Sequence, residues 1–314
     1  TVASRGVNSN RAEAASRGVD HRTLKAYNTS LRKAIKEGDE QTVDAVVAEL
    51  KQLTKWPVWE YVDTKTLSYT KAKTIIRSHM FLKKKFDAVG NFQKWKARLV
   101  AGGDQQDKSL YTNISSPTVA TETVFAIIAI AAIERRHIFT LDITGAYLNA
   151  VIPESQKVYM RLDPITARIL AQIDPTAAKQ RERDGTIVVR LTRALYGCVQ
   201  SARLWYDRLR EALLKLGFIQ NPYDLCVFNK VIKGKQLTIA FHVDDLIMTC
   251  ESQDALEQVV SAIEGEFEGV SVSRGDSHSY LGMQIETGDK DYYTVNMSGY
   301  LDKILDNNRI NMRH

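Results

Sequence analysis

The sequence predicts an α+β protein with a largely antiparallel sheet. Its strand-like segments come in hairpins: residues 75–86 pair with 92–100 around a five-residue loop, and 226–231 with 236–243 around Lys233-Gly234-Lys235. Helical segments lie between them without the strand–helix–strand alternation that a parallel sheet requires. The length of 314 residues corresponds to about two domains, at roughly 150 residues each.

The composition is that of an ordinary globular protein, with 44% hydrophobic and 25% charged residues. This excludes a wholly disordered chain, a collagen and a coiled-coil rod. The most apolar run, residues 125–133, is far shorter than the roughly 20 residues that cross a bilayer, so we expect no membrane span. Three scattered cysteines disfavour a disulfide framework or a structural zinc site and favour a reducing compartment. The net charge of +6 indicates an anionic partner only if the basic residues are clustered.

The elements follow in order along the chain. Residues 1–22 repeat Ala-Ser-Arg-Gly-Val and are poor in apolar residues, which predicts a flexible leader. The first residue is Thr1, so we expect a fragment or a processed product. A helical pattern runs from Leu24 to Leu53 and is interrupted at Gly38-Asp39. Beyond the first hairpin we expect helices at 121–135, 201–216, 253–267 and from 298, and strands at 138–143, 158–162, 187–191, 226–231, 236–243, 246–250, 280–286 and 292–295.

Aspartates stand at the ends of apolar strands. Asp244-Asp245 lies between the apolar stretches 239–243 and 246–248, and Asp142 lies near the end of the apolar strand 138–143. An aspartate doublet alone is more often a solvated turn. Between buried strands, however, two carboxylates repel and raise each other's pKa unless a cation neutralises them. If the strands are neighbours, the three carboxylates face each other and suit Mg²⁺ or Mn²⁺. A pair of such ions catalyses phosphoryl or nucleotidyl displacement.

The first hairpin is cationic. Lys83, Lys84 and Lys85 precede its loop, and Lys94, Lys96 and Arg98 follow it, alternating with apolar residues. A period of two places the last three cations on one face of the strand. Such a face can clamp a triphosphate, with forked contacts from Arg98 and a point charge from Lys96. A solvated basic face is the alternative.

Five blocks of the sequence follow one another in a recognisable order: KARLVA at 96–101, LDITGAYL at 141–148, ALYGCVQSARLWY at 194–206, HVDDL at 242–246 and YLGMQI at 280–285. In these blocks and their order, the chain resembles the reverse transcriptase of copia-type LTR retrotransposons from about residue 40 to its end. The sequence departs from the family pattern at His242 (usually Tyr or Phe), Val199 (usually Lys) and Ala202 (usually Pro), and none of these departures removes a carboxylate.

The resemblance implies a right-hand polymerase fold, in which fingers and a palm with an antiparallel sheet are followed by a partial thumb. The implied domains are a flexible leader at 1–22, N-terminal helices and the fingers hairpin at 23–116, and the palm with the first aspartate strand at 117–150. They continue with a fingers insertion at 151–200, the palm with the Asp-Asp hairpin and primer-grip-like strands at 201–288, and the start of a truncated thumb at 289–314.

The implied activity is that of an RNA-directed DNA polymerase, a nucleotidyltransferase. It would add dNTPs to a primer 3′-hydroxyl on an RNA or DNA template with two Mg²⁺ ions, for which Mn²⁺ is a possible substitute. Asp142 and Asp244 would be the main metal ligands, Asp245 a less direct third carboxylate, and the Ile143 carbonyl a further metal contact. Tyr147 would be the steric gate against a 2′-hydroxyl, with a packed core aromatic as the alternative.

The resemblance also implies residues along the nucleic-acid path. Gly197 and Gln200 would lie near the template and the incoming nucleotide, although Gly197 could equally be a turn residue. Leu281 and Gly282 resemble the primer grip, with sheet core as the alternative. His242 would pack beside the primer terminus rather than bind metal. The remaining expectations are that Lys83 and Lys85 contact nucleic acid, and that Trp205 and Tyr206 pack in the core of their helix rather than stack on bases.

The expected partners are primer–template RNA or DNA, dNTPs, and the RNase H and integrase regions of a parent polyprotein, without a membrane. The expected location is intracellular, in cytoplasmic virus-like particles, with the nucleus as a second location. Two other functions remain open: a catalytically inactive nucleic-acid-binding relic of such a polymerase, and a two-metal phosphohydrolase, which needs no gate aromatic.

Overall fold

The computed structural model describes residues 31, 40–86, 92–111, 113–287, 292–299 and 301. The predicted leader, the helix before Gly38, the loop 87–91 and the thumb residues beyond 301 lie outside this part of the chain. The chain forms two compact units. Unit 1 takes residues 1–112, 151–201 and 302–314, and unit 2 takes residues 113–150 and 202–301.

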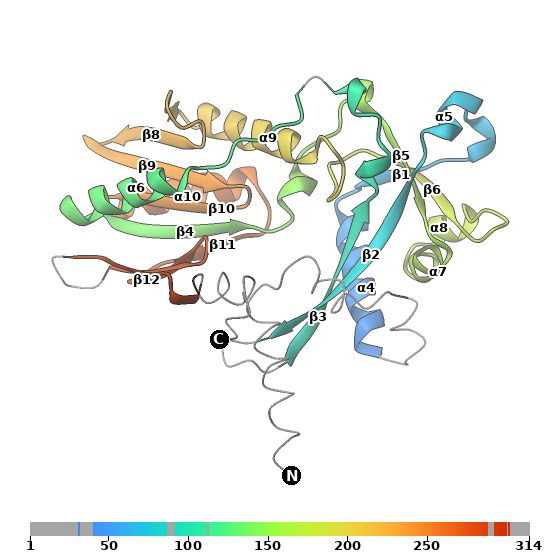
Figure 1. The fold of residues 1–314 in the computed structure, drawn as a ribbon, viewed down its shortest axis with the longest axis horizontal. Helices are drawn as coiled ribbons and strands as arrows, with labels where there is room; N and C mark the ends of the chain where they lie inside the picture. Colours follow the sequence, from blue (N-terminus) through green and yellow to red (C-terminus); the bar gives the residue numbers. More distant parts are fainter. Residues whose placement is uncertain are drawn as a thin grey trace, which may run out of the picture. The chain divides into compact units, whose positions relative to one another are not determined.

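Unit 1 is built on a five-stranded sheet in the order β1-β6-β5-β2-β3 (Figure 1). Its strands are β1 (Trp59–Tyr61), β2 (Ile76–Phe86), β3 (Phe92–Ala101), β5 (Val158–Leu162) and β6 (Ile187–Leu191). The β2–β5 pair is parallel, and the other pairs are antiparallel. The long β2–β3 hairpin therefore forms one edge of the sheet.

The helix α4 (Glu40–Lys55) packs beside β3. Val46, Leu50 and Leu53 are buried, as the helical period of the sequence predicts. The Leu99 amide of β3 donates to the Glu49 carboxylate over 3.0 Å, so the helix satisfies a backbone group that the sheet edge leaves open. The part of the unit that the structure describes also contains the helices α5 (Tyr69–Lys73), α7 (Pro164–Ile173) and α8 (Pro175–Lys179), with 3₁₀ turns η1 (Thr64–Thr66), η2 (Gly103–Gln105), η3 (Lys108–Leu110) and η5 (Glu154–Gln156).

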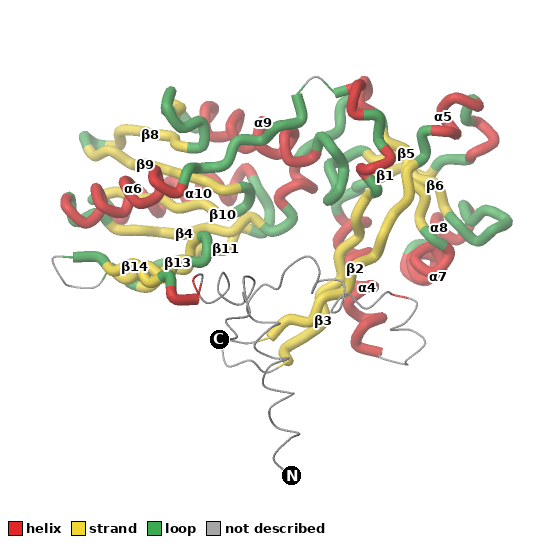
Figure 2. The backbone as a smooth tube through the Cα atoms, in the orientation of Figure 1, coloured by secondary structure: helices red, strands yellow, loops and turns green. Residues whose placement is uncertain are grey.

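Unit 2 contains a six-stranded antiparallel sheet in the order β11-β4-β10-β9-β8-β7 (Figure 2). Its strands are β4 (His137–Ile143), β7 (Ile219–Gln220), β8 (Val227–Ile232), β9 (Lys235–His242), β10 (Asp245–Cys250) and β11 (Val270–Ser273). The described part of the unit includes the helices α6 (Thr121–Ile133), α9 (Ser201–Lys215) and α10 (Gln253–Glu266), with the 3₁₀ turn η4 (Ala146–Asn149). Residues 298, 299 and 301 are also helical, where the sequence predicts a helix from 298. The mixed α+β class with largely antiparallel sheets is thus confirmed.

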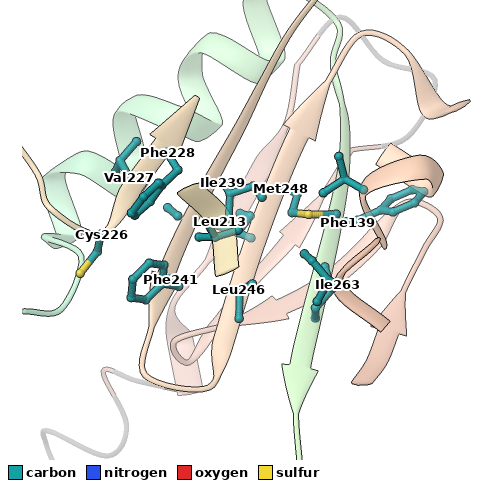
Figure 3. Close-up of a cluster of buried hydrophobic side chains, with 14 of the residues drawn as sticks. Phe139, Leu213, Cys226, Val227, Phe228, Ile239, Phe241, Leu246, Met248 and Ile263 are labelled. Atoms are coloured by element: carbon teal, nitrogen blue, oxygen red, sulfur yellow. The ribbon is translucent and has the colours of Figure 1, made fainter. Parts of the chain in front are cut away.

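Near the aspartates, apolar and acidic side chains of this sheet point to opposite faces. Leu246 of β10 pairs with Leu141 of β4 and Phe241 of β9, so these three side chains share one face. Figure 3 shows the core of the unit, in which Leu246 lies with Leu213 of α9 and Ile263 of α10. Strand alternation places the neighbouring aspartates on the opposite face.

A small sheet of β12 (Ser277–Tyr280), β13 (Met283–Glu286) and β14 (Thr294–Asn296) follows. The prediction of one continuous strand over 280–286 is wrong. Leu281 and Gly282 have φ of 50° and 80° and form a two-residue turn, as in a type I′ hairpin. Because β14 pairs with β13, residues 294–296 belong to unit 2, although the sequence division places them in the thumb.

Cys198, Cys226 and Cys250 are buried free thiols, so they form no disulfide framework. Across the described ranges, none of the helices combines the length and the apolar character that a bilayer crossing needs.

Candidate active site

Two of the candidate aspartates, Asp142 and Asp245, lie side by side across the sheet of unit 2, and the row of residues that they form is called the aspartate row together with Asp244 in the adjoining turn. Asp245 of β10 stands directly opposite Asp142 of β4 in the antiparallel register. The same register continues to His242 of β9 on one side and to Ser271 of β11 on the other. Directly opposed residues have Cβ atoms roughly 4.5–5.5 Å apart and point to the same face. The sheet therefore brings two carboxylates from positions far apart in the sequence into side-chain contact range.

Asp244 stands in the tight turn that joins β9 to β10. The residue before it, Val243, has φ of 60°, which is a rare conformation for a β-branched side chain. Such backbone strain costs about 1–3 kcal/mol and persists only where the surroundings enforce it. The Asp244 carbonyl accepts a hydrogen bond of 3.2 Å from the Ile143 amide, which joins the turn to the end of β4. This hydrogen bond thus links the turn that carries Asp244 to β4, the strand that carries Asp142.

The pKa of Asp245 reflects the other acidic side chains close to it. Burial raises the pKa of Asp245, and the negative charges of Asp244 and Asp142 raise it further, whereas His242 opposes the shift. Asp244 and Asp245 are half-buried, and Asp142 is exposed. Repulsion among carboxylates at a partly desolvated position is the condition that a bound cation relieves.

The donor set suits a hard divalent ion. Among the described residues, no three His, Cys, Asp or Glu side chains are gathered closely enough to enclose a metal by themselves. Mg²⁺ does not require such a cage, because it is commonly held by one or two carboxylates together with waters and substrate phosphates. The carboxylate oxygens of the row fit that coordination chemistry.

Tyr147 lies on η4, shortly after β4. Gly145, with φ of 67°, turns the chain out of the strand and begins η4. Tyr147 is half-buried and packs against the core of unit 2. Core packing accounts for the buried part of the side chain. The remaining exposed part keeps the predicted gate role open.

The predicted primer-grip residues form the tip of the β12–β13 hairpin. Leu281 packs against the core of unit 2, and Gly282 is exposed. Both residues therefore form a turn rather than the interior of a strand.

The hairpin of unit 1 gathers cations on one face. Lys83 stands opposite Lys96 in the β2–β3 register, and Lys85 stands opposite Lys94. Arg98 shares this face by strand alternation, and Ala97 and Leu99 point into the core. Like charges directly opposite each other destabilise a hairpin. An anionic ligand on this face would relieve that repulsion.

Lys84 is separated from the other lysines. It points to the opposite face, where its ammonium lies 5.0 Å from the centre of the Trp95 ring and 5.7 Å from that of Phe92. The basic run in the sequence therefore divides into two chemically different surfaces.

The segment 196–200 is packed onto the base of the hairpin within unit 1. The Arg98 guanidinium lies 3.9 Å from the centre of the Tyr196 ring, and the Ala101 amide donates to the Tyr196 carbonyl over 2.7 Å. Gly197 has φ of 89°, and a Cβ atom there would lie 2.1 Å from the Ala101 carbonyl oxygen. Backbone packing therefore explains the glycine without a ligand.

Gln200 is held by a residue that the sequence interpretation missed. Its side chain is 2% exposed, and its Oε1 accepts a hydrogen bond of 3.1 Å from Gln106. Gln106 Oε1 also accepts from the Val199 amide over 2.9 Å, and its Nε2 donates to the Tyr111 hydroxyl over 2.7 Å. A direct contact between Gln200 and a nucleotide would need Gln106 to release it. The only sequence signal for Gln106 is its position shortly after the KARLVA block.

Comparison with known proteins identifies the family. The family model described as reverse transcriptase (RNA-dependent DNA polymerase) matches residues 58–313, well over half of the chain. The chain belongs to the reverse transcriptase family.

Its relatives are retrotransposon polyproteins. The chain is 28% identical over 298 residues to the Transposon Ty1-LR2 Gag-Pol polyprotein of Saccharomyces cerevisiae, covering 89% of this chain and 15% of that protein. It is 28% identical over 302 residues to the truncated transposon Ty1-A Gag-Pol polyprotein of the same yeast, covering 90% and 23%. This reverse transcriptase is of the copia type, as the sequence blocks indicate, and it spans less than a quarter of the length of these relatives.

A solved structure titled apo telomerase from Candida tropicalis, truncated from the C-terminal domain, matches 80% of this chain and 60% of that chain. The identity is 8% and the TM-score 0.41, so the match carries no argument.

Proposed function

We propose that this reverse transcriptase domain adds dNTPs to a primer 3′-hydroxyl on an RNA or DNA template, using the aspartate row of unit 2 as its catalytic centre. The observation that carries the proposal is the register that sets Asp245 opposite Asp142, with Asp244 in the adjoining turn. In the right-hand description, unit 2 corresponds to the palm and unit 1 to the fingers.

Asp142 and Asp244 would hold the divalent ions, Mg²⁺ or alternatively Mn²⁺, with Asp245 as a third carboxylate and the Ile143 carbonyl as a further contact. Two such ions supply activation of the attacking hydroxyl and stabilisation of the leaving pyrophosphate. The pKa of Asp245 is raised first by burial and then by the charges of Asp244 and Asp142. The second cause supports the assignment, because bound cations would neutralise those charges.

Unit 1 would bind the triphosphate. Arg98 and Lys96 lie on the cationic face of the β2–β3 hairpin, and stacking on Tyr196 fixes the plane of the Arg98 guanidinium. Gly197 and Gln200 lie in the segment packed against this strand and would shape the nucleotide site. Gln200 would do so mainly by supporting that segment, since its amide is bonded to Gln106.

The remaining predicted residues would contact the nucleic acid. Lys83 and Lys85 would contact phosphates, His242 would lie beside the primer terminus at the end of the aspartate row, and Leu281 and Gly282 would support the primer strand. Tyr147 would exclude ribonucleotides. The relatives are Gag-Pol polyproteins, so we propose that RNase H and integrase regions accompany this domain in a parent polyprotein and that it acts inside the cell, in virus-like particles.

Primer extension with variants of the row tests the catalytic centre. Asp142→Asn and Asp244→Asn should each reduce dNTP incorporation to background with Mg²⁺ or Mn²⁺, because each removes a carboxylate from the row. Asp254→Asn, in the exposed first turn of α10, is the matched control and should retain activity.

The assay also separates the alternatives. A wild-type chain that binds primer–template without extending it would be an inactive relic, and phosphate release without extension would indicate a phosphohydrolase. Normal incorporation by Asp142→Asn or Asp244→Asn would overturn the assignment of the row.

A further inference from the structure

The turn that carries Asp244 is held from outside the sheet. The indole Nε1 of Trp205, on α9, donates a hydrogen bond of 2.8 Å to the carbonyl of Val243. Val243 is the residue with φ of 60° that directly precedes Asp244. A buried indole N–H needs a hydrogen-bond partner, and here the partner is the strained residue of the turn.

Trp205 is itself fixed by its surroundings. It is 1% exposed, and its ring meets Phe267 edge-on, with ring centres 5.4 Å apart at 68°. Its position on a well-packed helix gives the N–H little freedom to follow a moving turn. The hydrogen bond therefore restrains the turn rather than adapting to it.

Both peptide groups that flank Asp244 are consequently anchored. The Val243 carbonyl is bonded to Trp205 on α9, and the Asp244 carbonyl is bonded to the Ile143 amide at the end of β4. The direction of the Asp244 side chain is set by the orientation of these two peptide planes. Without the hydrogen bond from Trp205 to the Val243 carbonyl, the strained turn is free to relax, and the Asp244 carboxylate changes direction with it.

We infer that Trp205 is a positioning residue, whose indole N–H fixes the turn and so aims Asp244 along the aspartate row. The inference rests on the proposed function for its catalytic consequence. Its structural part, the restraint of the turn, stands without it. This assigns Trp205 more than the core packing expected from the sequence.

Trp205→Phe tests the hydrogen bond while keeping an aromatic ring. Phe267→Leu is the matched control, because it removes the ring contact and keeps the indole N–H. The first readout is amide hydrogen exchange over residues 242–246 in the full chain without metal or substrate. Exchange should accelerate about tenfold or more in Trp205→Phe and remain near the wild-type rate in Phe267→Leu, when the two variants are compared at equal stability.

The second readout is primer extension against Mg²⁺ concentration. In Trp205→Phe we expect kcat to fall roughly 10- to 100-fold, as for a misplaced catalytic group. The Mg²⁺ concentration for half-maximal rate should rise severalfold, and the KM for dNTP should stay within about twofold. Phe267→Leu should lower the Tm and leave the Mg²⁺ requirement unchanged.

The outcomes separate the two proposals. Unchanged exchange at the turn in Trp205→Phe, or equal changes in both variants, would overturn the positioning role and leave core packing. Faster exchange in Trp205→Phe together with an inactive wild type would keep the restraint and reject the polymerase assignment.

Discussion

At the scale of single residues, Tyr147 carries the prediction about substrate selectivity. Its half-buried ring follows β4 on η4, so an aromatic wall near Asp142 would leave no room for a 2′-hydroxyl. Tyr147→Ala should lower the preference for dNTPs over rNTPs in kcat/KM by roughly 10- to 200-fold, the range for steric discrimination of one small group. Tyr147→Phe keeps the ring and should retain the preference. Unchanged selectivity in Tyr147→Ala would make Tyr147 a core aromatic only.

Single residues also show what the sequence could reveal. The flanking apolar strands made the aspartates recognisable, and neighbouring strands place Asp142 and Asp245 opposite each other. The roles of Gln106 and Trp205 were not recognisable, because each depends on a hydrogen bond between positions far apart in the chain, 94 residues for Gln106 and Gln200. No local pattern records such a bond.

At the scale of elements, the contact between α4 and β3 gives a prediction about charge. Burial is the main cause that raises the pKa of Glu49, and the hydrogen bond from the Leu99 amide opposes it, followed by the charges of Arg98 and Lys96. Glu49→Gln keeps an acceptor for the Leu99 amide and, at a pH above the folded pKa of Glu49, removes a negative charge beside the cationic face. Steady-state kinetics should show a KM for dNTP lowered about two- to fourfold, the effect of one nearby charge in water. A higher KM would contradict triphosphate binding by this face.

The difference in stability between the wild type and Glu49→Gln depends on pH. Because the pKa of Glu49 is higher in the folded chain than in the unfolded chain, the ionised carboxylate destabilises the fold above its folded pKa and not below about 4.3. Thermal unfolding should therefore give Glu49→Gln a higher Tm than the wild type at pH 7. The difference in Tm should shrink as the pH falls through the folded pKa of Glu49. A difference independent of pH would point to packing instead.

Element boundaries were predictable where polar and apolar residues alternate or follow the helical period. β5 and β6 have the predicted bounds, and β3 differs from its prediction by one residue. The break at Leu281 was not predictable, because leucine is an unusual residue at positive φ and the apolar alternation continues through the turn. Between the predicted strands 158–162 and 187–191 the sequence analysis predicts no helix, but the structure has α7 there. Asp163, which caps its first turn, and Pro164, which begins it, are the local signals for this helix.

At the scale of the whole molecule, the net charge of +6 predicts salt-sensitive binding to nucleic acid. The hairpin register makes this specific, because Lys83 and Lys85 share the cationic face and Lys84 does not. In primer–template titrations over a range of salt concentrations, Lys83→Gln and Lys85→Gln should each reduce the slope of log Kd against log salt by about one. Lys84→Gln is the control and should leave the slope unchanged. Equal effects of all three would mean that binding does not depend on which face of the hairpin carries the lysine.

The register of β4 also constrains the order of events during synthesis. Both neighbours of this strand, β10 and β11, are translated about 100 residues or more after Asp142. Until β10 and β11 emerge from the ribosome, both edges of the apolar strand β4 lack a hydrogen-bonding partner. Unpaired strand edges of this kind promote aggregation. A nascent chain interrupted before residue 245 thus lacks the strand that sets Asp245 opposite Asp142, and the proposed site can form only after β10 pairs with β4.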